Sequence, residues 1–151
     1  ADCVPIILYD SHNQTIGCVH AGWEGALSGI IENSIKKFKK MNSKNKIFAS
    51  IGPCIGVKSY EVDLNFYKRF LIKSKNNTAY FLKKGKYKKL FNLRKYVGDK
   101  LIKLGVKIDN VKYDTFKEKG KFFSYRRSQK MNDYDYGRCI SVISLTKFGQ
   151  N

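Results

Sequence analysis

The chain has 151 residues, 42% of them hydrophobic and 14% aromatic, which is enough to bury the core of one folded domain and excludes a disordered tail. No apolar run approaches the roughly 20 residues that span a membrane, and no signal peptide opens the sequence. The formal net charge is +18, but lysine far outnumbers the arginine that phosphate-reading surfaces favour. We therefore expect a solvated basic surface, with neither nucleic acid nor membrane as a partner.

Two apolar, β-prone runs flank the polar turn 11–14 and predict a β-hairpin at the start of the chain. If the chain reverses about Ser11 and His12, Cys3 stands directly opposite His20, with Cβ atoms about 5 Å apart on one face. A thiol and an imidazole so placed can share a metal ion or act as nucleophile and base. Both can also be purely structural, and a one-residue slip in register would separate them.

Residues 26–41 carry apolar side chains at helical spacing and lysines on the opposite face, which predicts an amphipathic helix. The glycine-rich turn 22–25 precedes it and directly follows His20. The free N–H groups at Gly25 could therefore hold an anion near the Cys3/His20 face, or the glycines could only permit a tight turn.

A buried strand is predicted over 46–51, followed by a sharp Gly/Pro loop over 52–56. Three side chains after this strand could line a pocket or simply lie at the surface: Cys54, Tyr60 and Glu61. The later elements are a helix capped by Asp63 and ending at Ile72, strands over 79–82 and 87–91, a helix over 93–104 between Asn92 and Gly105, and a strand over 106–113.

Arginine is scarce here, yet three arginines gather near the end of the chain: Arg126, Arg127 and Arg138. Guanidinium groups bind phosphate or carboxylate bidentately, so we interpret this cluster as ligand-binding; the alternative is a surface ion pair with Asp133 or Asp135. Residues 139–145 are predicted to close the chain as a buried strand. Because strands and helices alternate irregularly around at least one hairpin, the predicted fold is a mixed-sheet α/β or α+β domain.

The four cysteines are widely spaced, and none forms a CxxC pair. In a chain of this size without a secretory signal, they are expected to be reduced thiols of a cytoplasmic protein.

Four signatures occur in order over essentially the whole chain: ADCVP (1–5), HAGWEG (20–25), IGPCIG (51–56) with YEV (60–62), and FSYRR (123–127) with GR (137–138). With these, the sequence resembles the laccase-domain family, also called multicopper polyphenol oxidase-like, peptidoglycan editing factor and purine nucleoside phosphorylase. The resemblance implies a four-layer α/β/β/α fold with mixed sheets, like that of the CNF-toxin-like cysteine hydrolases.

The resemblance also implies a zinc site made by a cysteine and two histidines, of which Cys3 and His20 match two. The remaining family histidine lies upstream of the Ala-Asp-Cys motif. We therefore expect residues 1–151 to be a C-terminal fragment of one laccase-like domain, lacking its N-terminal part and binding zinc weakly. Copper is less expected, since a multicopper oxidase needs many histidines and this chain has two.

Two positions depart from the family pattern. Glu24 stands where the family usually has arginine, which reverses a charge beside the site, and Asp114-Thr115 replaces a Cys-Thr pair.

The implied function is a purine nucleoside enzyme with Cys3 and His20 as catalytic residues. It would cleave adenosine, inosine or guanosine with phosphate to the free base and ribose 1-phosphate, or deaminate adenosine with the help of zinc. Arg126, Arg127, Arg138 and Gly25 would hold substrate or phosphate. Two alternatives stay open: a Cys–His hydrolase or amidase that edits peptidoglycan precursors, and a degenerate domain without catalysis.

Overall fold

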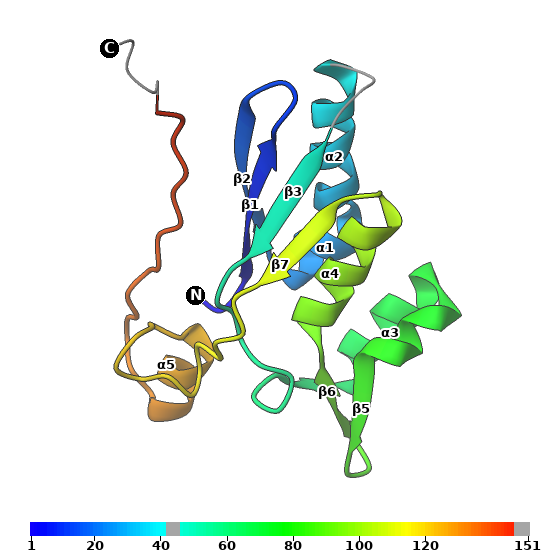
Figure 1. The fold of residues 1–151 in the computed structure, drawn as a ribbon. Helices are drawn as coiled ribbons and strands as arrows, with labels where there is room; N and C mark the ends of the chain where they lie inside the picture. Colours follow the sequence, from blue (N-terminus) through cyan, green and yellow to red (C-terminus); the bar gives the residue numbers. More distant parts are fainter. Residues whose placement is uncertain (42–45, 147–151) are drawn as a thin grey trace.

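A computed structural model describes residues 1–41 and 46–146 (Figure 1). Its elements are β1 (Val4–Asp10), β2 (Thr15–Ala21), α1 (Trp23–Ser28), α2 (Ile30–Met41), β3 (Ile47–Ile51), β4 (Glu61–Asp63), α3 (Leu64–Lys73), the 3₁₀ helix η1 (Lys75–Tyr80), β5 (Phe81–Lys84), β6 (Lys88–Phe91), α4 (Leu93–Lys103), β7 (Lys107–Asn110) and α5 (Tyr125–Met131).

The main sheet has four strands in the order β2-β1-β3-β7. β1 runs antiparallel to β2 and β3, whereas β3 and β7 are parallel, so the sheet is mixed. Alternate residues of β1, among them Val4, Ile6 and Leu8, are buried on the face that α2 and α4 cover. The predicted mixed α+β class is therefore confirmed (Figure 1).

A second, three-stranded sheet in the order β4-β6-β5 packs with α3 around a cluster of aromatic rings. Phe70 and Phe91 are fully buried at its centre, with ring centroids 4.7 Å apart. Trp23, from α1, joins this cluster through Phe66 at 4.8 Å. The cluster thus connects the small sheet to the turn that follows β2.

The predicted helix caps are confirmed. Asp63 accepts a hydrogen bond from the backbone N–H of Phe66 at 2.7 Å, and Asn92 accepts one from Lys95 at 3.0 Å. Gly105 has φ +81°, the left-handed conformation expected just after a helix. No helix in the described part of the chain is long and apolar enough to cross a bilayer.

Two predictions about secondary structure are wrong. The helix predicted over 26–41 is two helices, because Gly29 takes φ +98° between α1 and α2 and ends the first one. Residues 139–145 form no strand: they are extended and find no pairing partner among the described residues. Ile140 and Val142 are consequently 86% and 73% exposed. This segment runs along the side of the main sheet that the helices leave open (Figure 1).

Candidate functional site

The register of the β1–β2 hairpin differs from the predicted one. Pro5, and not Cys3, lies opposite His20, because the turn contains all four residues 11–14. The Asp10 side chain holds this longer turn by accepting a hydrogen bond from the backbone N–H of His12 at 3.1 Å. The shift of two residues keeps Cys3 and His20 on the same face, since side chains in a strand alternate with a period of two.

Gly22 marks the place where Cys3 and His20 converge. A Cβ atom added at Gly22 would stand 3.0 Å from the Cys3 Sγ and 3.9 Å from the His20 Nε2. The thiol and the imidazole therefore border the same small space, which exists because position 22 has no side chain. The predicted pair is brought together diagonally across the ladder rather than face to face.

Asp2 anchors Cys3 to three distant segments. Its backbone carbonyl accepts a hydrogen bond from the N–H of Ile55 at 3.0 Å. One carboxylate oxygen accepts from the Thr115 hydroxyl and the other from the Arg126 N–H, both at 2.7 Å. Sequence reasoning missed this role, although the position directly before the candidate cysteine could have suggested it.

The Cys3 thiol is half-buried, whereas His20 is exposed. Burial raises the pKa of the Cys3 thiol, and the neighbouring Asp2 carboxylate raises it further. Cys3 is thus set into the wall of the site, while His20 faces solvent at its rim.

Two cavities meet at Cys3. The first, the imidazole-side cavity, has a volume of about 350 Å³ and is bordered by Cys3, Pro5, His20, Thr115 and Arg138 among others. The second, the aromatic cavity, has a volume of about 310 Å³. Its main lining residues are Asp2, Cys3, Trp23, Tyr60, Tyr125, Arg126 and Tyr136. Ala1 and Cys3 line both cavities, so the thiol stands on the wall between them.

The three predicted arginines take different positions. Arg126 lines the aromatic cavity, where its guanidinium lies 5.3 Å from the Tyr60 ring and donates to the Glu61 carbonyl at 2.6 Å. Arg138 lines the imidazole-side cavity, and its exposed side chain also lies 3.9 Å from the Asp135 carboxylate. Both the ligand-binding and the ion-pair interpretation therefore remain compatible with Arg138.

Arg127 instead ties down its own loop. Its guanidinium donates to the backbone carbonyls of Thr115, Phe116 and Phe122 at 2.6 to 2.9 Å, and it lines neither cavity at Cys3. Gly25 lies inside the six-residue helix α1, also outside both cavities. For these two residues a contact with phosphate stays a prediction from the sequence.

Of the three side chains expected to line a pocket after β3, only Tyr60 does so at this site. Cys54 is fully buried, and burial raises its pKa to about 12. Glu61 forms ion pairs with Lys84 and Lys88 at 2.8 and 2.5 Å.

Both departures from the family pattern have a structural setting. Asp114 accepts hydrogen bonds from the backbone N–H groups of Gly56 and Phe116 at 3.0 Å and from the Ser59 hydroxyl at 2.7 Å. It therefore holds the loop after β3 in place. Glu24 is exposed in the first turn of α1 and lines neither cavity at Cys3.

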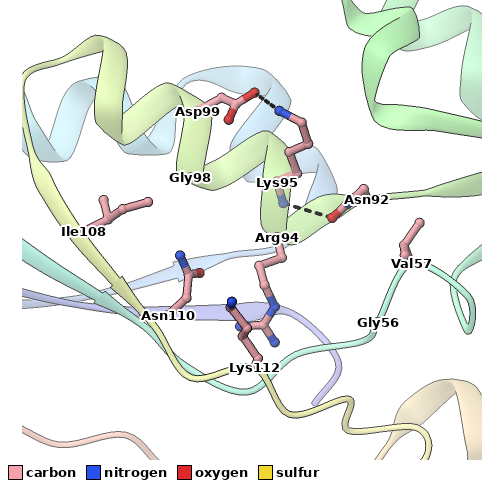
Figure 2. A pocket seen from close by; sticks show the side chains of 10 residues that line it. All are labelled: Gly56, Val57, Asn92, Arg94, Lys95, Gly98, Asp99, Ile108, Asn110 and Lys112. Atoms are coloured by element: carbon pink, nitrogen blue, oxygen red, sulfur yellow. Dashed lines mark hydrogen bonds and ion pairs between the residues drawn. The ribbon is translucent and has the colours of Figure 1, made fainter.

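A third cavity, of about 410 Å³, lies between α4 and β7 (Figure 2). Its most basic residue, Arg94, donates to the backbone carbonyls of Gly52, Val111 and Tyr113 at 2.7 to 3.0 Å. Lys95 is paired with Asp99 at 2.6 Å. Because Arg94 and Lys95 are already bonded or paired, we regard their side of this cavity as part of the scaffold.

Metal binding requires more donors than this site supplies. Cys3 and His20 provide one sulfur and one nitrogen, and no cluster of three candidate metal ligands occurs within residues 1–41 and 46–146. A tetrahedral zinc site takes three or four protein ligands, of which the described residues supply two.

The main sheet is mixed, and its β1–β2 hairpin carries a thiol and an imidazole beside a cavity. This arrangement places the protein among those with a Cys–His site on a mixed α+β fold. The chain belongs to the family described as multi-copper polyphenol oxidoreductase laccase, whose profile matches residues 1–146. This confirms the resemblance to the laccase-domain family.

Curated relatives and solved structures agree with this assignment. A protein of Rickettsia prowazekii named purine nucleoside phosphorylase is 43% identical over 96% of this chain and 61% of its own length. A purine nucleoside phosphorylase of Haemophilus influenzae is 34% identical over 95% and 57%. The crystal structure of Bacillus licheniformis YfiH has a TM-score of 0.77 and 29% identity, covering 85% of this chain and 51% of that one. The chain thus spans about three fifths of the length of these curated relatives.

Proposed function

We propose that the whole protein is a zinc-dependent purine nucleoside phosphorylase whose site includes Cys3 and His20. The observation that carries this proposal is the convergence of these two side chains over Gly22, at the junction of two cavities. The names of relatives that match nearly the whole chain support the substrate class.

In the proposed reaction, a phosphate oxygen forms a bond to the anomeric carbon of the ribose while the bond from that carbon to the purine nitrogen breaks. The bonding electron pair leaves with the base, which takes up a proton. His20 stands at the rim of the imidazole-side cavity, where it would hold zinc beside the attacking phosphate, and the proton for the base would come from solvent. The guanidinium of Arg138, in the same cavity, would hold phosphate.

Zinc is the cofactor that we propose. Cys3 and His20 would hold it, and the remaining donors must come from outside the described residues. A bound zinc ion would supply a Lewis acid at the thiol. The same donors would suit adenosine deamination, which we keep as a second reaction of this site. Copper is not proposed.

A second candidate is a metal-free Cys–His hydrolase or amidase acting on peptidoglycan precursors. The Cys3 Sγ and the His20 Nε2 lie 3.0 and 3.9 Å from one point, the Cβ position at Gly22, and this favours the candidate because a nucleophile and its base must border the same small space. Activity that survives a strong chelator but not thiol alkylation would support this candidate over the zinc enzyme.

The four-layer α/β/β/α arrangement is also a proposal. Its support is the open face of the main sheet, where Ile7 and Tyr9 border a shallow cavity together with Ile143. The exposed, alternating Ile140 and Val142 suit a strand of a second sheet stacked on that face. The cytoplasmic location remains a prediction as well, supported by four cysteines that form no disulfide.

The test is to incubate the whole protein, purified with zinc, with adenosine in the presence and absence of phosphate. Phosphate-dependent release of adenine that Cys3→Ala abolishes would establish phosphorolysis. Inosine as the product would indicate deamination instead. If wild type and Cys3→Ala are equally inactive, the nucleoside function is refuted and a non-catalytic domain becomes the better description.

A further inference from the structure

The aromatic cavity differs in chemistry from the imidazole-side cavity on the other side of Cys3. Its walls include one indole and three phenol rings, those of Trp23, Tyr60, Tyr125 and Tyr136. The imidazole-side cavity contains no aromatic ring of this kind and is bordered by His20, Arg138 and small or aliphatic residues. The thiol thus separates a wall of flat rings from a space that carries one imidazole and one guanidinium group.

The inner rings of the aromatic cavity are held firmly. Trp23 packs on Phe66 with ring centroids 4.8 Å apart, and Tyr60 packs on Phe91 at 5.6 Å. Both partners belong to the aromatic core around α3 and β6. These two rings are therefore positioned before any ligand arrives, which lowers the entropic cost of binding.

The outer rings are not needed for the core. Tyr125 is 47% exposed and lies 5.1 Å from Tyr136, ring centroid to ring centroid. Burial of apolar area alone does not explain why a half-exposed tyrosine lies against a partly buried one at the edge of a cavity. Aromatic rings at such a mouth present flat faces on which a ligand ring can stack.

The charged side chains of this cavity are already engaged. Both carboxylate oxygens of Asp2 accept hydrogen bonds, and Arg126 is engaged with Tyr60 and a backbone carbonyl. The Tyr60 hydroxyl, by contrast, forms no hydrogen bond within the part of the chain that the structure describes. It is therefore available to donate to a ring nitrogen or an exocyclic oxygen of a ligand.

We propose that the aromatic cavity is the base-binding subsite, where a purine stacks among Trp23, Tyr60 and Tyr125. This inference rests on the proposed nucleoside function and adds which cavity holds which part of the substrate. The ribose would lie at Cys3, with phosphate on the imidazole side near Arg138. A cavity of about 310 Å³ is at the lower end of ligand pockets, which suits one planar base rather than a dinucleotide.

Stacking among aromatic rings also predicts selectivity. A purine offers a larger flat face than a pyrimidine, so adenine and hypoxanthine should bind better than uracil. Replacing a stacking aromatic residue with alanine removes its contact with the base and should lower the affinity for the base about fivefold or more.

The experiment titrates the whole protein with adenine, hypoxanthine and uracil while following tryptophan fluorescence. Trp23→Phe assigns the signal, since it keeps an aromatic ring but removes the indole. We expect adenine to quench the Trp23 signal and Tyr125→Ala to weaken adenine binding about tenfold. Tyr87→Ala, which removes a 66% exposed tyrosine from the β5–β6 turn, should leave adenine binding unchanged.

Tyr60→Phe tests the hydroxyl without removing the ring. It should raise the KM for adenosine severalfold, with kcat much less affected. Adenine that fails to quench Trp23, or binds equally well to Tyr125→Ala, would overturn the base subsite even if phosphorolysis is observed. Quenching that depends on Tyr125 in a protein without phosphorolysis would instead uphold the subsite and refute the proposed reaction.

Discussion

Gly22→Ala is the substitution that tests the Cys3/His20 site most directly. Gly22 has φ −70° and ψ 167°, a conformation that alanine adopts without strain. It is the N-cap of α1 but provides no side-chain hydrogen bond there. The free energy of unfolding should therefore change by less than about 1 kcal/mol.

The added methyl group acts on the site instead. It would stand 3.0 Å from the Cys3 Sγ, whereas unstrained non-bonded contacts of carbon lie at about 3.5 Å or more. The thiol must move by about 0.5 Å, which is the tolerance within which a catalytic or metal-binding group has to be held. Because Asp2 is bonded to three segments, the backbone of Cys3 cannot easily follow. We expect nucleoside turnover and zinc affinity to fall about tenfold to hundredfold.

The assay compares phosphorolysis, zinc content and urea unfolding of the wild type, Gly22→Ala and Gly98→Ala. Gly98 is the matched control, since a Cβ there would meet Ile108 and Ile51 at ordinary distances of 3.5 and 3.6 Å. Removing this glycine from the interior of α4 should stabilise the protein by about 0.5–1 kcal/mol without affecting the site. Full activity and full zinc content in a folded Gly22→Ala protein would refute the placement of the site over Gly22.

Three further substitutions test the scaffold. Arg94→Met leaves three backbone carbonyls without their donor and should lower the free energy of urea unfolding by about 2–4 kcal/mol. The control Lys95→Met removes only a surface ion pair and should lower it by less than about 1 kcal/mol. Equal losses in the two variants would contradict the role of Arg94 in holding these three carbonyls. Asp114→Ala removes the acceptor of three hydrogen bonds and should lower the free energy of unfolding by about 2–3 kcal/mol. Faster proteolysis of the loop after β3 is a second expected result. An unchanged urea midpoint of unfolding would contradict the role of Asp114 in holding that loop. Glu61→Gln tests the pH dependence of stability. Hydrogen bonds from Lys84 and Lys88 lower the pKa of Glu61 from 4.5 to about 2. The carboxylate therefore stabilises the fold fully above pH 4.5, and this contribution is lost as the pH falls toward 2. Because both lysines are about half exposed, the difference from wild type at pH 7 should be only about 0.5–1 kcal/mol, and a difference that persists at pH 2 would contradict the assignment.

Local signals predicted most secondary structure correctly. The caps Asp63 and Asn92 and the left-handed Gly105 lie where the sequence placed them, because capping and left-handed turns depend on a few adjacent residues. Gly29 lies inside a regular apolar pattern that predicts one continuous helix, but its positive φ divides that helix. The apolar composition of 139–145 predicts a buried strand, but a strand needs a partner, which the described residues do not provide.

The candidate site shows the same division between local and long-range information. The chain's signatures predicted Cys3 and His20 as a pair, since a thiol and an imidazole are recognisable from residue type and motif. Their actual relation depends on a four-residue turn and on the empty position at Gly22, which bring them together diagonally. Likewise, Arg126 and Arg127 are neighbours in sequence, yet one faces the aromatic cavity and the other binds three carbonyls. Adjacent side chains on a helix point in different directions, so which of them reaches a site depends on what the helix packs against.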